Sequence, residues 1–349
     1  MNADRPILIG PAVKGVVEMS LIDAYGRKHD YLRVSVTDRC NLRCIYCMSE
    51  EGIEQISHNE ILCYEDMLKV IRTGTEMGIT KIRVTGGEPL VRLGIVDFIR
   101  EIAALPGVSD LAMTTNGILL PRYAAGLKTA GLKRINISLD SLKPLVYNSI
   151  TRCGKLEDVL AGISAALEND LQPVKINVVL MKGINDGEVE DFLQLAREKP
   201  LHIRFIEYMP IGDHDHSYGN HYLPLSFVEE TAKKAGLPLT PVPTYRGPGP
   251  ADYYTLPGGK GMIGLIHAIS KHFCSTCNRL RLTSEGNLKA CLYWQEEKSV
   301  RPVIDNPDAL KALFRKVLAN KPAEHQMASD GRCGAVQPGT MRSMSKTGG

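Results

Sequence analysis

The sequence predicts an α/β fold, in which an open, partial parallel barrel of six βα units precedes a smaller antiparallel β module. Short β-rich runs alternate with amphipathic helical segments through the middle of the chain, which is typical of a parallel sheet. Six such units are two fewer than a closed eightfold barrel contains. After Pro210, short apolar runs separated by Gly- and Pro-rich turns favour hairpins instead.

The elements can be placed in order along the chain. The segments between the strands, such as EDMLKVIRTGTEMG, repeat apolar residues at three and four positions, as amphipathic helices do. Further helices are expected near 225–235 and over 308–318, and hairpins from about Tyr253 to Leu292. The six candidate strands cover 31–37, 81–85, 110–115, 134–139, 174–180 and 203–209.

Four parts are expected from this pattern. They are an N-terminal extension over 1–22, the partial barrel over 23–210, the C-terminal module over 211–320 and a tail over 321–349. The tail is poor in large apolar residues, so it offers little surface to pack and could remain a frayed end.

Composition and charge limit the classes of partner. The chain has 349 residues, of which 44% are hydrophobic, so a sizeable core is expected. Its 42 basic and 39 acidic side chains leave a net charge of +3, too little to indicate nucleic acid or a membrane surface. No apolar run is long enough to span a membrane, and the first residues do not resemble a signal peptide. A cytoplasmic protein is therefore expected.

The cysteines favour metal binding over disulfides. Nine cysteines are an odd number in a long chain without a signal. Cys63, Cys153 and Cys333 stand alone in the sequence. The other six form two tight groups, namely Cys40, Cys44 and Cys47, then Cys274, Cys277 and Cys291.

The first group lies in TDRCNLRCIYC, directly after the first candidate strand. A loop at the carboxyl end of a parallel strand carries its residues to the functional end of such folds. Three thiolates leave one metal position for a distant fourth ligand or for a substrate. A zinc loop and scattered core thiols are the alternatives.

The second candidate strand ends in GGEP, at Gly86–Pro89. Glycine lets the backbone approach a ligand closely, and Glu88 adds a carboxylate at the strand end. Alone, this segment is an ordinary turn.

The Cys-x3-Cys-x2-Cys spacing, with an aromatic residue before its last cysteine, resembles the radical S-adenosylmethionine superfamily. The resemblance implies a [4Fe-4S] cluster on Cys40, Cys44 and Cys47, whose fourth iron chelates S-adenosylmethionine and whose reduction yields a 5′-deoxyadenosyl radical. Ordinary strand-end packing is the alternative for the implied cosubstrate contacts. These contacts are Tyr46, Gly87, Glu88, Ser138 and Met209.

The second group is a Cys-x2-Cys-x13-Cys arrangement within FCSTCNRLRLTSEGNLKACL. A hairpin would return Cys291 to the first two cysteines. On spacing alone, a zinc knuckle completed by His267 or His272 is a serious alternative.

Together with TDRCNLRCIYCM, GGEPLVR and the terminal Gly348-Gly349, this string resembles the GTP 3′,8-cyclase family of molybdenum cofactor biosynthesis. The resemblance runs from about residue 22 to about residue 292 and resumes in the final residues. It implies a second [4Fe-4S] cluster on Cys274, Cys277 and Cys291, whose open iron binds the guanine of GTP. It also implies that the terminal Gly348-Gly349 pair enters the active site.

Three phosphates need cations in fixed geometry, which suits the planar fork of arginine. Strand alternation places Lys81 and Arg83 on one face, and likewise Arg279 and Arg281. A solvated surface charge is the alternative for any single arginine. The resemblance implies GTP contacts at Arg33, Lys81, Arg83, Thr114, Lys175, Arg204, Arg279 and Arg281, the last two also assisting the radical step.

The implied activity is abstraction of the C3′ hydrogen of GTP, followed by C3′–C8 bond formation to give 3′,8-cyclo-7,8-dihydro-GTP. Implied partners are a reducing electron donor, the accessory cyclic pyranopterin monophosphate synthase and a second copy in a homodimer.

Two other functions are weighed against this one. A radical S-adenosylmethionine peptide maturase would carry more grouped cysteines and has no reason to line its barrel with arginine. A zinc-binding module that recognises RNA is disfavoured by the charge of +3 and the single Trp.

Overall fold

The computed structural model describes residues 20–52, 56–211, 218–245, 249–327, Thr340 and 342–347. All six predicted strands are confirmed, with limits that differ by at most two residues from those expected. They are β1 (Tyr31–Ser35), β2 (Lys81–Thr85), β3 (Asp110–Thr115), β4 (Arg134–Ser138), β5 (Val174–Leu180) and β6 (His202–Glu207).

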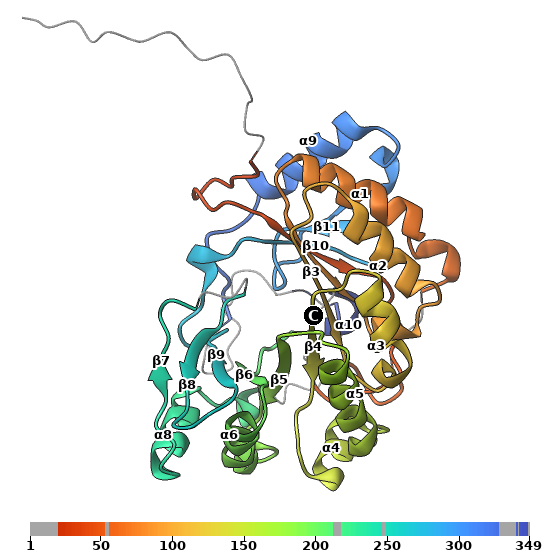
Figure 1. The fold of residues 1–349 in the computed structure, drawn as a ribbon. Coiled ribbons are helices and arrows are strands. Elements are labelled where there is room, and N and C mark those ends of the chain that lie inside the picture. The colour runs from red at the N-terminus through yellow and green to blue at the C-terminus, as the bar shows by residue number, and fades with distance from the viewer. Residues whose placement is uncertain are drawn as a thin grey trace, which may run out of the picture.

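The sheet is larger than the six predicted units. Its C-terminal strands are β7 (Thr240–Pro241), β8 (Asp252–Thr255), β9 (Met262–Ile266), β10 (Arg279–Leu282), β11 (Asn287–Lys289) and β12 (Lys298–Ser299). The order is β12-β11-β10-β1-β2-β3-β4-β5-β6-β9-β8-β7, so within the described residues the curved sheet is open (Figure 1). β10 pairs in parallel with β1, and β9 with β6, whereas the outer pairs are antiparallel.

Helices cover the outer side of the sheet (Figure 1). The first six follow the barrel strands, as right-handed βα connections require. They are α1 (Tyr64–Glu76), α2 (Ile95–Ala104), α3 (Leu120–Thr129), α4 (Pro144–Thr151), α5 (Leu156–Glu168) and α6 (Val189–Glu198). The C-terminal part adds α7 (Tyr218–His221), α8 (Ser226–Lys234), α9 (Pro307–Ala319) and α10 (Met344–Thr347).

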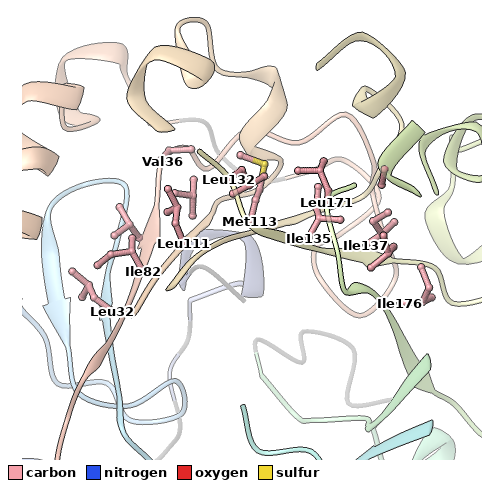
Figure 2. Packing of buried hydrophobic residues seen from close by; sticks show 14 of the residues in the cluster. Leu32, Val36, Ile82, Leu111, Met113, Leu132, Ile135, Ile137, Leu171 and Ile176 are labelled. Carbon is pink, nitrogen blue, oxygen red and sulfur yellow. The ribbon is translucent and has the colours of Figure 1, made fainter. Parts of the chain in front are cut away.

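Alternation along each strand separates an apolar outer face from a polar inner face. Leu32, Ile82, Leu111, Ile135 and Ile176 are fully or almost fully buried, and Figure 2 shows them on neighbouring strands of the core cluster. Burial of apolar surface of this kind contributes about 25 cal/mol per Å² removed from water. Because successive strand side chains point to opposite faces, the residues between these positions point into the barrel.

The sheet is continuous across the predicted boundary at residue 210, because β9 and β10 extend it at its two sides. The predicted domain limits themselves stay a prediction, and residues 1–19 of the predicted extension lie outside the described residues. Among the helices that the structure describes, none is long and apolar enough to cross a membrane.

Candidate functional site

The inner face of the sheet encloses a cavity of about 1990 Å³, its open mouth included. All six grouped cysteines line it. The sequence-predicted groups therefore share one cavity, although they lie more than 200 residues apart in the chain.

The two cysteine groups occupy opposite ends of this cavity. Cys40, Cys44 and Cys47, the first triad, follow the carboxyl end of β1. Cys274 and Cys277 precede β10, which runs parallel to β1 with Arg279 beside Tyr31. Cys291 follows β11, which runs antiparallel to β10 and so returns to the same end. These three form the second triad, and the length of the barrel strands separates the triads.

The environment of the first triad favours protonated thiols over thiolates. Burial raises the pKa of Cys40 to about 11 and that of Cys47 to about 12. The buried carboxyls of Glu88 and Asp140 line the same end of the cavity. Coordination to a metal centre would deprotonate these thiols outright.

The second triad has a cationic surrounding instead. Burial alone would raise the pKa of Cys277, but Arg279 and Lys321 outweigh it and lower this pKa to about 6. Arg27 donates from Nη1 to the Cys274 carbonyl over 2.8 Å. The two triads therefore differ in electrostatics although both offer three sulfur ligands.

The donor sets fit iron–sulfur clusters. Each triad presents three soft sulfur donors to one cavity, which is the ligand type that such clusters require. Among the described residues, no three His, Cys, Asp or Glu side chains lie close enough together to hold a single metal ion.

The five residues predicted to contact S-adenosylmethionine all line the cavity. Tyr46 donates to Asp140 Oδ2 over 2.7 Å. Glu88 accepts hydrogen bonds from the Thr115 hydroxyl and the Asn116 amide, both at 2.7 Å. Burial nevertheless raises the pKa of Glu88 to about 7, against the opposing effect of these donors. Gly87, Ser138 and Met209 complete the set.

Gly87 fits only because it has no side chain. Its amide donates to the Thr37 carbonyl over 2.7 Å, and a Cβ there would lie 2.3 Å from the Arg39 carbonyl oxygen. We expect Gly87→Ala to lower the free energy of unfolding of the metal-free protein by about 1–3 kcal/mol, the usual cost of overpacking. Gly187→Ala is the control, since a Cβ at Gly187 meets nothing within 4 Å. Equal urea midpoints for the two variants would contradict this prediction.

Arginines form the wall between the triads. Arg281, Arg33 and Arg83 are neighbours in register on β10, β1 and β2. Arg204 on β6 and Arg279 on β10 also line the cavity, as does Thr114 at the end of β3. The Nε atoms of Arg83 and Arg204 are buried and have no hydrogen-bond partner among the described residues. Buried donors without acceptors are costly, so this wall is suited to an anionic ligand.

The structure places neither of the two predicted lysines, Lys81 and Lys175, in the cavity wall. Lys81 Nζ lies 2.8 Å from Asp30, so its charge is already paired. Lys175 is buried and is not among the residues that line the cavity, and its Nζ lies 2.9 Å from the Tyr253 hydroxyl. Burial, then the charges of Arg204, Arg134 and Arg83, lower the pKa of Lys175 to about 6.

Sequence reasoning missed several residues of this site. Asp140 follows predicted Ser138 by two positions, so the same strand end could have indicated it. Asn116 Nδ2 lies 4.0 Å from Cys40 Sγ, and Lys321 Nζ lies 3.4 Å from Cys277 Sγ. No spacing motif indicates Lys321, because only the fold brings α9 to the second triad.

The tail lies partly outside the described residues. Gly348 and Gly349 are among those not described, so their predicted entry into the cavity stays a prediction. Met344 and Ser345, just before them, line the cavity. Arg281 Nη1 donates to the Thr347 carbonyl over 3.3 Å. Cys63 and Cys153 are exposed and away from the cavity wall, and Cys333 is not described.

Comparisons with known proteins identify the enzyme class to which this chain belongs. The Radical SAM superfamily model matches residues 34–196, and the Molybdenum Cofactor Synthesis C model matches residues 201–327. The crystal structure of Streptococcus suis SuiB bound to S-adenosylmethionine covers 83% of this chain and 67% of its own, with a TM-score of 0.53. At 13% identity, that likeness concerns the fold alone. Fold and family models together define a radical S-adenosylmethionine enzyme.

The curated relatives are more specific. GTP 3′,8-cyclase of Listeria monocytogenes serotype 4b is 49% identical over 308 residues, covering 88% of this chain and 92% of the relative. GTP 3′,8-cyclase of Petrotoga mobilis is 51% identical over 308 residues, covering 87% and 94%. The chain belongs to the GTP 3′,8-cyclase family.

Proposed function

We propose that this cavity converts GTP to 3′,8-cyclo-7,8-dihydro-GTP, the first step of molybdenum cofactor biosynthesis. The observation that carries the proposal is the pair of cysteine triads at opposite ends of one arginine-lined cavity, in a chain of this family. The 5′-deoxyadenosyl radical takes the hydrogen atom from C3′ of GTP, and C3′ then bonds to C8. One electron from the reductant and one proton complete the dihydro product, an isomer of GTP.

Two [4Fe-4S] clusters and S-adenosylmethionine are the cofactors. Cys40, Cys44 and Cys47 would hold one cluster, and Cys274, Cys277 and Cys291 the other. When bound, the first cluster supplies the electron that cleaves S-adenosylmethionine, and the second offers its iron to guanine. The protein's part is to hold the two small molecules in fixed positions and to exclude water.

Residues at the first triad would hold the cosubstrate. Glu88 lies just after β2 with its carboxylate fixed by three donors, from Leu90, Thr115 and Asn116, and it can accept a further hydrogen bond from the methionine amino group. Tyr46 and Asp140 form a hydrogen-bonded pair at the same end of the cavity. Gly87, Ser138 and Met209 supply wall surface for the remainder of the molecule.

The arginine wall would hold GTP. Arg33, Arg83, Arg204, Arg279 and Arg281 offer forked guanidinium donors to the cavity, and a triphosphate carries several negative charges. Thr114 adds a hydroxyl, and Lys175 would become protonated when a phosphate lies beside it. Lys81 is the weakest member, because Asp30 already pairs with its charge. We assign Arg279 and Arg281 to the radical step because they separate the second triad from the cavity centre.

The test is anaerobic turnover of the reconstituted enzyme, with both small molecules followed by mass spectrometry. We expect 5′-deoxyadenosine to form together with an isomer of GTP. Cleavage of S-adenosylmethionine that ignores GTP would favour a peptide maturase. Absence of cleavage by protein with both clusters would contradict any radical enzyme. Zinc binding in place of iron–sulfur clusters would favour the zinc module.

Partners follow from the chemistry of this reaction. A low-potential electron donor must reduce the first cluster. An accessory cyclic pyranopterin monophosphate synthase would consume the cyclised nucleotide. We place the enzyme in the cytoplasm, where thiols stay reduced, and propose a homodimer from the family resemblance.

A further inference from the structure

A buried lysine lies behind the second triad. Lys321 follows α9 directly and has only 4% of its surface exposed. Its Nζ donates to Cys277 Sγ over 3.4 Å and to the Arg279 carbonyl over 2.9 Å. Cys277 lines the cavity, whereas Lys321 is not among the residues that line it.

The chain around Lys321 is tied to the loop of the second triad. The Lys321 amide donates to Leu318 at the end of α9 over 3.0 Å. The next two carbonyls, of Pro322 and Ala323, each accept from Arg27 over 2.7 Å. Arg27 also donates to the Cys274 carbonyl, and Asp23 holds Arg27 through a 2.5 Å ion pair. The ammonium group of Lys321 is therefore fixed relative to the triad.

A fixed cation beside Cys277 would affect the reduction potential of a cluster bound there. An ammonium group that donates to a cluster thiolate stabilises negative charge on the cluster, and it does so more strongly when buried in a low dielectric. Reduction adds one electron, so such a group raises the reduction potential. At the first triad, a neutral amide takes a comparable place, since Asn116 Nδ2 lies 4.0 Å from Cys40 Sγ.

We propose that Lys321 is a positioning residue that raises the reduction potential of the second cluster and holds the Cys277 thiolate from outside the cavity. This inference rests on the proposed function, since it takes Cys274, Cys277 and Cys291 as the ligands of that cluster. It adds a residue that contacts neither GTP nor S-adenosylmethionine, so its effect reaches the reaction only through the cluster.

The experiment is a potentiometric titration of the full-length holoenzyme, followed by electron paramagnetic resonance. The signal of the first cluster is recognised by its response to S-adenosylmethionine, and the other signal belongs to the second cluster. The variants are Lys321→Arg, which keeps the charge, Lys321→Gln, which keeps a neutral donor, and Lys321→Met, which keeps neither. Lys311→Met in α9, the helix that precedes Lys321, is the control, because Lys311 pairs with Glu76 at 2.7 Å instead.

We expect the potential of the second cluster to follow the order Lys, Arg, Gln, Met, from highest to lowest. At the wild-type midpoint, the ratio of oxidised to reduced second cluster should rise about 10-fold in the Met variant, which for a one-electron couple is a fall in potential of about 59 mV. The control and the first-cluster signal should not change. A flat series at full iron content would overturn the inference.

The Lys321 variants could also fail to bind the second cluster, and the pattern of failure tests the same inference. Loss of the second cluster in the Gln and Met variants with retention in the Arg variant would support the holding role of the charge. Loss in all three variants, with the control intact, would assign Lys321 to folding and overturn the inference. A wild-type second-cluster signal that ignores GTP would contradict the proposed function instead, and the potential series could still be measured.

Discussion

Replacing Cys44 by alanine is expected to abolish the cleavage of S-adenosylmethionine, whereas replacing Cys277 by alanine is expected to preserve cleavage and abolish cyclisation. Each change removes one of three sulfur ligands, at opposite ends of the cavity. Loss of an outer-shell partner already costs roughly 10–100-fold in activity, so loss of a ligand should cost more than about 100-fold. Production of 5′-deoxyadenosine and of the GTP isomer, measured in the same reaction, separates the two defects.

Cys63→Ala is the matched control. Cys63 is exposed and is not among the residues that line the cavity. It should retain both products at wild-type levels. If Cys277→Ala still formed the GTP isomer, the second triad would not hold the substrate. If both triad variants lost cleavage equally, the two ends of the cavity would not have separate roles.

The barrel could be predicted from sequence because its strands are short, β-branched and regularly spaced by amphipathic helices. β1 to β6 lie where the pattern indicated. The sequence did not indicate that β9 and β10 pair in parallel with β6 and β1, because local patterning carries no information about the partner of an edge strand. This pairing matters for function, since it brings the second triad to the amino end of the barrel.

Site residues were predictable where a strand end or a motif marks them. Glu88 and the six cysteines are of this kind, and all of them line the cavity. Strand alternation predicts that Lys81 faces the cavity, but its side chain forms a salt bridge with Asp30 instead. Alternation alone cannot reveal such a salt bridge. Lys321 could not be predicted from the sequence, because only tertiary packing brings it to Cys277.

Electrostatics link the fold to the reaction. The carboxyl end of the barrel holds buried acids, and burial raises the pKa of Asp140 to about 6 as it does that of Glu88 to about 7. The middle and amino end hold arginines and Lys321 instead. A cationic cosubstrate suits the first end and an anionic nucleotide the second, so the charge pattern itself favours one orientation of the two molecules.

Arg281→Ala is expected to have the second large effect. Arg281 is buried, lines the cavity beside Arg33 and donates to the Thr347 carbonyl of the tail. Burial, then the charge of Arg279, lowers its pKa to about 10, so it remains cationic at neutral pH. Removal of a preorganised donor at a reacting centre costs about 2.7–4 kcal/mol, so kcat/KM for GTP should fall about 100- to 1,000-fold.

Arg281→Lys separates charge from geometry, because lysine keeps the charge without the bidentate fork. It should recover only part of the loss. Arg100→Ala, on the exposed side of α2, should behave as wild type. The affinity for GTP should be measured without turnover, and the ratio of 5′-deoxyadenosine to GTP isomer with turnover. Full activity in Arg281→Ala would contradict the placement of GTP between the triads, whereas intact GTP binding with uncoupled cleavage would place Arg281 at the radical step itself.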